Sequence, residues 1–210
     1  FKGEIPEIKN MVPFAPFDFF IKRKLFLHNM GHAMTAYLGD LLGIEYIYEA
    51  IDNDEIYIIV KGAMEESARA LSKKYDVPLE DIMLHMTDLL ERFTNAALRD
   101  TCSRVGREPA RKLSPQDRLI GSATLALEMG ITPAYIAIGA AAGLCRYMNE
   151  SEDKTLTAEA VLESISGLDM KSELAQLILD MYELIREGKS FGELRRMADK
   201  KVAEKLRNVI

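Results

Sequence analysis

The sequence predicts an all-α fold, and three observations carry this prediction. Apolar residues recur every three or four positions, as in Ile82, Met86, Leu89 and Phe93, rather than every second position. Helix-capping signals punctuate the chain, and 48% of its 210 residues are hydrophobic, which is enough to bury a core. We therefore expect helices at 18–42, 45–52, 54–75, 79–95, 115–129, 133–149, 157–165, 171–187 and 191–207.

The first seventeen residues and one β-rich stretch need separate treatment. Residues 1–17 hold three of the seven prolines, so we expect an extended lead-in before a helical domain at 18–210. Residues 56–60, IYIIV, could compete as a strand. The strongly helical residues 61–74 that follow favour one helix over the whole stretch.

Hydroxyl residues and glycines mark the expected helix ends. A hydroxyl followed by proline is typical of an N-cap and a first helical residue. Ser190 and Glu193 have the spacing of a capping box. The two hydroxyl–proline pairs are Ser114-Pro115 and Thr132-Pro133, and the glycines placed where helices should stop are Gly43, Gly130 and Gly188.

The longest uncharged run indicates a buried helix rather than a membrane-spanning one. Residues 129–145 include Pro133 and three glycines. A spanning helix needs about 20 apolar residues, and this run is shorter. The basic segment 189–207 is interpreted as a solvated outer helix.

Charge and cysteine usage exclude several classes of protein. The 27 Lys and Arg and 33 Asp and Glu give a net charge of -6, which has the wrong sign for a general nucleic-acid or membrane binder. Cys102 and Cys145 form no CxxC motif, and we expect no secretory leader. We therefore expect a reduced, cytoplasmic protein with no nucleic-acid or membrane partner.

The most informative stretch is the helix at 23–43, RKLFLHNMGHAMTAYLGDLLG. Apolar side chains cover most of its circumference, so it should lie in the middle of the fold. Lys24, Asn29 and His32 nevertheless share an arc of about 140° on an α-helix. Because an unpartnered buried polar group costs about 1–3 kcal/mol, this face is either satisfied internally, with Lys24 reaching solvent, or functional.

The same helix also carries two histidines at a spacing that could bind a metal. His28 and His32 are four residues apart, which is zinc-ligand spacing, and HNMGH resembles HExxH. Asn29 occupies the position of the general-base Glu, and an amide could not activate water. His85 is the remaining histidine. We therefore predict no metal, and a metalloprotein remains a minor alternative.

The stretch KLFLHNMGHA, with Lys24, Asn29 and His32, resembles the active-site signature of the mannitol dehydrogenase family, the polyol-specific long-chain dehydrogenases. Within that family it is most similar to the members that act on mannitol 1-phosphate. The resemblance covers about residues 1–170 and leaves the tail unassigned. Its collinear motifs are FKGEIPEI at the start, IVKGAMEES at 59–67, VGREPARKLSPQDRLI at 105–120 and ISGLD at 165–169.

The resemblance implies the multi-helical C-terminal substrate domain of a two-domain, NAD-dependent oxidoreductase, of the 6-phosphogluconate dehydrogenase C-terminal type. Such an enzyme would interconvert mannitol 1-phosphate and fructose 6-phosphate. Lys24 would be the general base, and Asn29 and His32 would hold and polarise the reacting oxygen, without a metal. A lysine in apolar surroundings suits this role, because its pKa can fall from about 10.4 toward neutrality.

A sugar phosphate also needs an anion site. Residues 99–118 carry six basic and three acidic side chains, so this segment is locally positive in an acidic chain. Arginine forks match phosphate oxygens, and we predict phosphate contacts from Arg111 and Lys112, then Arg107. The alternative is that these side chains pair with acidic neighbours or face another domain.

The sequence shows no pattern typical of a dinucleotide-binding domain. No two of the 13 glycines are separated by a single residue, so the chain has no GxG turn. We expect NAD to be bound mainly by a missing N-terminal Rossmann domain, and this chain to be inactive alone. The remaining alternatives are a hexuronate reductase or free mannitol dehydrogenase of the same family, and a non-catalytic helical binding module.

Overall fold

The computed structural model describes residues 3, 7–10 and 16–207, and this part of the chain is helical without a β-strand. The all-α prediction is confirmed, and residues 56–60 lie inside a helix. Much of the predicted lead-in, including Pro6 and Pro13, lies outside the described residues. The elements are α1 Asp18–Arg23, η1 Lys24–Asn29, α2 Met30–Leu41, α3 Ile47–Asp52, α4 Asp54–Tyr75, α5 Leu79–Phe93, η2 Ala96–Leu98, α6 Cys102–Val105, α7 Pro109–Lys112, α8 Ile120–Glu128, α9 Ala134–Glu150, α10 Ala158–Ser164, α11 Glu173–Arg186 and α12 Phe191–Arg207.

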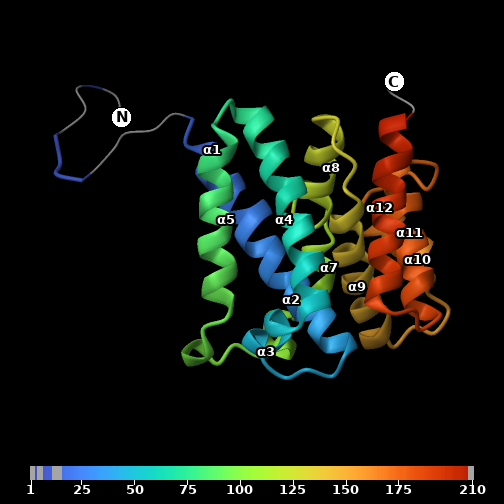
Figure 1. The fold of residues 1–210 in the computed structure, drawn as a ribbon. Coiled ribbons are helices and arrows are strands. Elements are labelled where there is room, and N and C mark those ends of the chain that lie inside the picture. Colours follow the sequence, from blue (N-terminus) through green and yellow to red (C-terminus); the bar gives the residue numbers. More distant parts are fainter. Residues whose placement is uncertain (1–2, 4–6, 11–15, 208–210) are drawn as a thin grey trace.

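Helix α9 lies at the centre of the packing, against α2, α4 and α11. Helix α5 forms one edge of the domain and α10 to α12 form the other (Figure 1). The small side chains of α9 allow a close crossing with α2, because a Cβ at Gly139 would clash with the Met34 side chain. The interpretation of the uncharged run as a buried helix is confirmed. None of the described helices has the length and apolar character needed to cross a membrane.

Most helix boundaries agree with the sequence pattern, and the exceptions lie in one region. Residues 96–112 were predicted without helix but form η2, α6 and α7, each too short to show apolar periodicity. The helix predicted to begin at Pro115 begins at Ile120, and Ser114 does not cap it. By contrast, Gly43, Gly130 and Gly188 all adopt positive φ at helix ends, as predicted.

The last helix is confirmed at its predicted boundaries, with its capping box. The Ser190 amide donates to the Glu193 carboxylate, and the Glu193 amide donates to the Ser190 hydroxyl. Its interpretation as a solvated outer helix was incomplete, because Phe191, Leu194 and Ala198 are buried. Its basic face is partly paired, since Lys201 and Lys205 contact Asp180 and Glu173, each at 2.6 Å.

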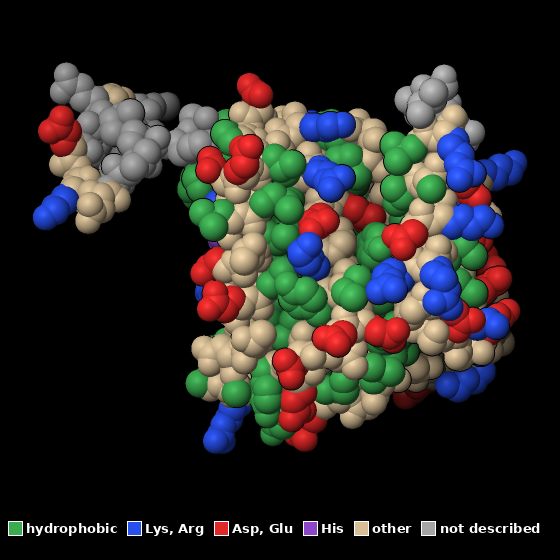
Figure 2. Space-filling model, viewed as in Figure 1, with side chains coloured by type: hydrophobic (Ala, Val, Ile, Leu, Met, Phe, Trp, Pro, Cys, Tyr) green, Lys and Arg blue, Asp and Glu red, His purple; other side chains and the backbone are tan. Residues whose placement is uncertain are grey.

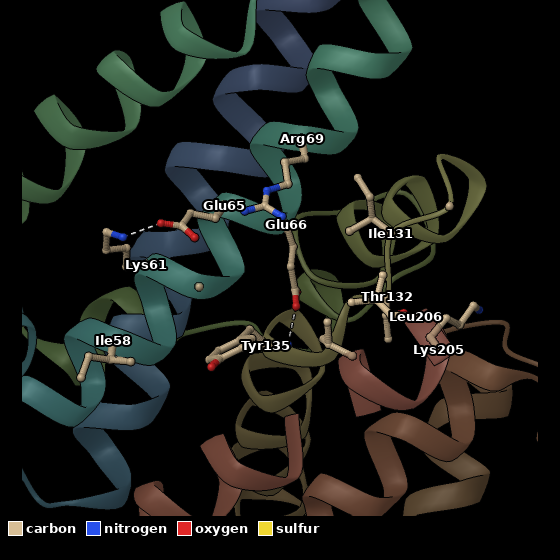
Figure 3. Close-up of a pocket in the computed structure, with 13 residues that line it drawn as sticks. Ile58, Lys61, Glu65, Glu66, Arg69, Ile131, Thr132, Tyr135, Lys205 and Leu206 are labelled. Carbon is tan, nitrogen blue, oxygen red and sulfur yellow. Dashed lines mark hydrogen bonds and ion pairs between the residues drawn. The ribbon is translucent and has the colours of Figure 1, made fainter. Parts of the chain in front are cut away.

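The start of α9 is capped from a different helix. Thr132 was predicted as the N-cap, but the cap position is Pro133, which offers no side-chain acceptor. Instead, Glu66 of α4 accepts hydrogen bonds from the amides of Tyr135 and Ile136 at 2.9 and 3.0 Å (Figure 3). This carboxylate satisfies amides that a helix start leaves without intrahelical partners, and it faces the positive end of the helix dipole.

We predict that Glu66→Ala lowers the free energy of unfolding by about 2–3 kcal/mol, because two amides at the start of α9, one buried and one part-buried, lose their hydrogen-bond acceptor. Urea denaturation followed by circular dichroism measures the change. Glu65→Ala is the matched control: Glu65 pairs with Lys61 one turn away on the same helix and is partly exposed. Such a pair contributes about 0.5 kcal/mol, so equal losses in the two variants would contradict the capping role.

Candidate functional site

The polar face of the 23–43 helix is built on a change of helix type. The rod predicted as one α-helix is α-helical in α1, π-helical over Lys24–Asn29 and α-helical again in α2. In an α-helix, residues five apart point about 140° away from each other. In a π-helix the hydrogen bonds join residues i and i+5, so Lys24 and Asn29 approach the same side of the rod. Short π-helical segments are rare in proteins, and those that occur are often found at functional sites.

Helix α4 contacts the π-helical segment directly. The hydroxyl of Ser67, which is buried, donates to the carbonyl oxygen of Phe26 at 2.7 Å. Immediately after the segment, a Cβ at Gly31 would lie 2.6 Å from the sulfur of Met64 and 3.3 Å from the Phe93 ring. The segment is therefore held between α4 and α5, where its backbone has little room to return to an α-helical register.

Lys24, Asn29 and His32 line one cavity of about 320 Å³. The structure therefore brings the three predicted catalytic residues together. Asn29 is half-buried, and in the described part of the chain its amide makes no side-chain hydrogen bond. His28 of η1 also lines the cavity, and it is the remaining lining residue that sequence reasoning identified. The rest of the wall comes from α3, α5 and the residues that follow α5: Ile47, Tyr48, Arg92, Phe93, Asn95, Leu98 and Asp100.

Lys24 differs from the buried lysine that the sequence suggested. Its side chain is exposed at the rim of the cavity. No other described residue forms a hydrogen bond or ion pair with its ammonium. Lys24 follows α1, on a side of the rod that none of the described helices covers.

His32 is held in the cavity wall in its neutral form. Its ring stacks on Phe93 with centroids 5.2 Å apart and an interplanar angle of 16°. Burial, together with the nearby groups of His28 and Arg104, lowers the pKa of His32 to about 4. A neutral imidazole offers one donor and one acceptor nitrogen. Its Nε2 lies 3.5 Å from Oδ2 of Asp100.

The neighbouring His28 does not complete a metal site within the described residues. Burial lowers the pKa of His28, and the positive charges of Arg92 and Lys24 lower it further. The His28 and His32 ring centroids are 6.1 Å apart. In the portion of the chain that the structure describes, no group of three His, Cys, Asp or Glu side chains could hold a metal ion.

The predicted phosphate residues lie outside the lining of this cavity. Arg111 pairs with Glu108 at 2.9 Å and with Asp117 at 3.4 Å. Lys112 is 4% exposed, and its ammonium donates to the carbonyl oxygens of Val105 and Arg107. Arg107 itself is exposed. Arg111 therefore pairs with acidic neighbours, as the alternative interpretation expected. Arg107 has no such partner among the described residues and could contact a phosphate.

A larger cavity lies on another part of the molecule. Its volume is about 760 Å³, and α4, α9 and α12 form its walls. Figure 2 shows apolar side chains between α4 and α12 with charged side chains on both sides. Most of its ionisable groups already have partners. Lys61 pairs with Glu65, and Glu66 caps α9 (Figure 3). Lys205 pairs with Glu173, which lies outside the lining. None of the predicted catalytic residues lines it.

Comparison with known proteins gives a consistent set of relatives. The sequence profile of the mannitol dehydrogenase C-terminal domain matches residues 17–209, so the resemblance extends beyond residue 170 into the tail. A mannitol-1-phosphate 5-dehydrogenase of Caldanaerobacter subterraneus is 46% identical over 171 residues, which are 78% of this chain and 44% of the relative. One of Thermoanaerobacter pseudethanolicus is 41% identical over 178 residues, 80% of this chain and 45% of the relative. The chain thus spans less than half the length of these relatives.

Two solved structures share the fold. The ternary complex of Pseudomonas fluorescens mannitol 2-dehydrogenase with NAD and D-mannitol has a TM-score of 0.68 and 18% identity, and the match covers 89% of this chain and 42% of that protein. A substrate-free D-sorbitol dehydrogenase has a TM-score of 0.59 and 20% identity, with 83% and 40% covered. At these identities the likeness establishes the fold alone, which this chain shares with less than half of each of these dehydrogenases.

We predict that His32 makes the stability of the chain depend on pH. Its pKa is about 4 in the folded state and 6.5 in the unfolded chain, so the unfolded chain binds more protons between these values. The stabilisation is fully present above pH 6.5 and is lost as the pH falls toward 4, and it amounts to about 3 kcal/mol.

Urea denaturation at several pH values measures this effect. His32→Gln should remove about 3 kcal/mol of the pH dependence relative to the unsubstituted chain. His85→Gln is the control, because His85 lies on α5 outside this cavity and is less buried, and it should remove less. Parallel pH profiles for the original chain and His32→Gln would contradict the neutral, buried imidazole.

Proposed function

The chain belongs to the mannitol dehydrogenase family, as its C-terminal domain, and from this premise we propose that it supplies the substrate-binding and proton-transfer groups of an NAD-dependent polyol dehydrogenase. The proposed reaction interconverts mannitol 1-phosphate and fructose 6-phosphate. The observation that carries the proposal is the meeting of Lys24, Asn29 and His32 in one cavity. The names of the two curated relatives favour the phosphorylated substrate.

In the proposed oxidation, one substrate carbon becomes a carbonyl. The hydroxyl proton leaves for the amine of Lys24, and the hydride on the same carbon leaves for the nicotinamide ring of NAD. The oxygen carries alkoxide-like charge as the proton departs. Asn29 and His32 hold this oxygen and polarise it, which lowers the barrier most where charge develops. The reverse direction returns the proton from Lys24 to the new hydroxyl.

The residues of this chain fit one side of such a site. NAD, when bound, supplies the hydride acceptor, and we propose that an N-terminal Rossmann domain holds most of it. The sequence has no GxG turn, and the part of the chain that the structure describes has no strand. Lys24 at the rim is accessible to a second domain that closes over the cavity. On this proposal the chain alone is inactive.

The alternatives are distinguished by specific observations. A hexuronate reductase or free mannitol dehydrogenase would use the same three residues and would not need a phosphate site. A non-catalytic helical module would tolerate loss of Lys24, and a metalloprotein would retain a metal after purification. The cytoplasmic location remains part of the proposal, and both cysteines are free and buried, as a reducing compartment allows.

Lys24→Ala tests the proposed base in a protein that includes the nucleotide-binding half. The turnover number for mannitol 1-phosphate should fall about 10²–10⁴-fold, because the proton loses its acceptor. Lys22→Ala is the matched control: its ammonium lies over the Phe26 ring, 4.8 Å from the centroid, and should not affect turnover. Rates are read from NADH absorbance, and unchanged turnover in Lys24→Ala would favour the non-catalytic module.

We propose Arg111, Lys112 and Arg107 as the residues that contact the substrate phosphate. Arg107 gives the clearest test because its side chain is exposed. Arg107→Ala should raise the KM for mannitol 1-phosphate about 10-fold or more, since a charge-assisted hydrogen bond is lost, and leave unphosphorylated mannitol unaffected. Arg99→Ala, in the same basic segment, is the control. If Arg92→Ala has this effect instead, the phosphate binds at the cavity wall and the assignment to Arg107 is wrong.

A further inference from the structure

Asp100 is fixed in the cavity wall by the backbone on both sides of it. The carbonyl oxygen of Asp100 accepts a hydrogen bond from the amide of Ile47 at 2.9 Å. Two residues further along the chain, the amide of Cys102 donates to the carbonyl oxygen of Glu45 at 2.8 Å. These bonds surround the isolated antiparallel bridge between Tyr46 and Thr101. Thr101 also caps α6. The start of α3 and the start of α6 therefore hold Asp100 between them.

The two carboxylate oxygens of Asp100 have different neighbours. Oδ1 accepts from the guanidinium of Arg104, one turn further along the chain. Oδ2 faces His32, with 3.5 Å between Oδ2 and Nε2 of the imidazole. The side chains of Asp100 and His32 are 20% and 25% exposed, so solvent competes little for this contact. Both residues line the cavity that contains Lys24.

We propose that Asp100 is a positioning residue that selects the Nε2–H tautomer of His32 and, with Arg104, sets the direction of its ring. A carboxylate only accepts hydrogen bonds, and Arg104 already occupies its other oxygen. The nitrogen of His32 that faces Asp100 must therefore carry the hydrogen. The distance of 3.5 Å is longer than a hydrogen bond. The proposal requires it to shorten when a ligand fills the cavity, because catalytic hydrogen bonds are often long until a ligand is bound.

This assignment replaces the oxygen-polarising role of His32 with a hydrogen-bond-accepting role, and this part of it rests on the proposed function. With its hydrogen directed to Asp100, a neutral His32 offers Nδ1 as an acceptor for a hydroxyl of the polyol. Asn29 is then the side chain that donates to the oxygen on which charge develops. His32 selects and orients the alcohol, and Asn29 stabilises the alkoxide-like state.

The tautomer is measured on this chain without any substrate. Long-range proton–nitrogen NMR spectra of histidine labelled with nitrogen-15 distinguish the two neutral forms, and His32→Gln identifies the His32 signals. Near neutral pH, His32 should be the Nε2–H form. Observation of the Nδ1–H form in the unsubstituted chain would overturn the proposal.

Asp100→Asn gives a sharper test because it preserves the shape of the side chain. Arg104, which only donates, should retain the amide oxygen, so the amide NH₂ of the variant turns toward His32. Nε2 then has to accept, and His32 should switch to the Nδ1–H form. Asp88→Asn is the matched control, since Asp88 is exposed and pairs with Arg92 at 3.8 Å, and it should leave the tautomer unchanged. An unchanged tautomer in Asp100→Asn would contradict the positioning role.

The kinetic consequence separates this inference from the proposed function. In a protein with its nucleotide-binding half, Asp100→Asn should lower kcat by about 10-fold or more with a smaller change in KM. If the tautomer switches but Lys24→Ala retains full activity, the proposed function fails and the positioning role stands. If Lys24→Ala is inactive and the tautomer does not switch, the proposed function stands and the role of Asp100 is wrong.

Discussion

The candidate site depends on the packing that keeps one turn of a buried rod out of the α-helical register. A π-helical turn is rare and occurs mostly as a single turn inside an α-helix, so we infer that surrounding contacts hold it in place. Here the Ser67 hydroxyl supplies a donor to the Phe26 carbonyl, and Met64 and Phe93 fill the space beside Gly31. Helix α4 also supplies Glu66, which caps α9. The geometry of the cavity and the packing of the central helix are therefore coupled through one helix.

The sequence predicted the elements whose signals are local and repeated. Helices α4, α5, α9 and α12 each show several turns of apolar periodicity, and their boundaries agree closely with the prediction. The same reasoning identified Lys24, Asn29 and His32 as one polar face. It could not identify the π-helical turn. This helix is apolar on most of its sides, so a turn that contains one additional residue hardly changes the apolar pattern of the sequence. The burial of Lys24 was also overestimated, since apolar neighbours in sequence do not reveal which side of a rod is left uncovered.

Other features depend on residues that are far apart in the sequence. Glu66 caps a helix that begins 68 residues later, and no capping motif near Thr132 could indicate it. Asp100 reaches His32 because the residues at 96–112 form three short helical elements, each too brief to show a period. The position of Asp100 is set by backbone hydrogen bonds to Glu45 and Ile47, which are tertiary contacts. These contacts become visible only when the chain is folded.

The side chains of the basic segment at 99–118 differ in whether their positive charge is already paired or buried in the folded chain. The ammonium of Lys112 is buried against two carbonyl oxygens and 5.8 Å from the centroid of the Tyr37 ring. Burial, together with the positive charges of Arg118 and Arg111, lowers the pKa of Lys112 to about 8. Arg111 and Arg118 both pair with Asp117. These three cations hold the chain between α6 and α8 together, and Arg107 projects from the same segment without such a partner among the described residues.

A site that binds a phosphate needs a cation whose hydrogen bonds are not already made, because exchanging one charged partner for another gains little. Much of the positive charge in the segment is therefore already paired, whereas Arg107 and Arg99 are exposed and have no such partner among the described residues.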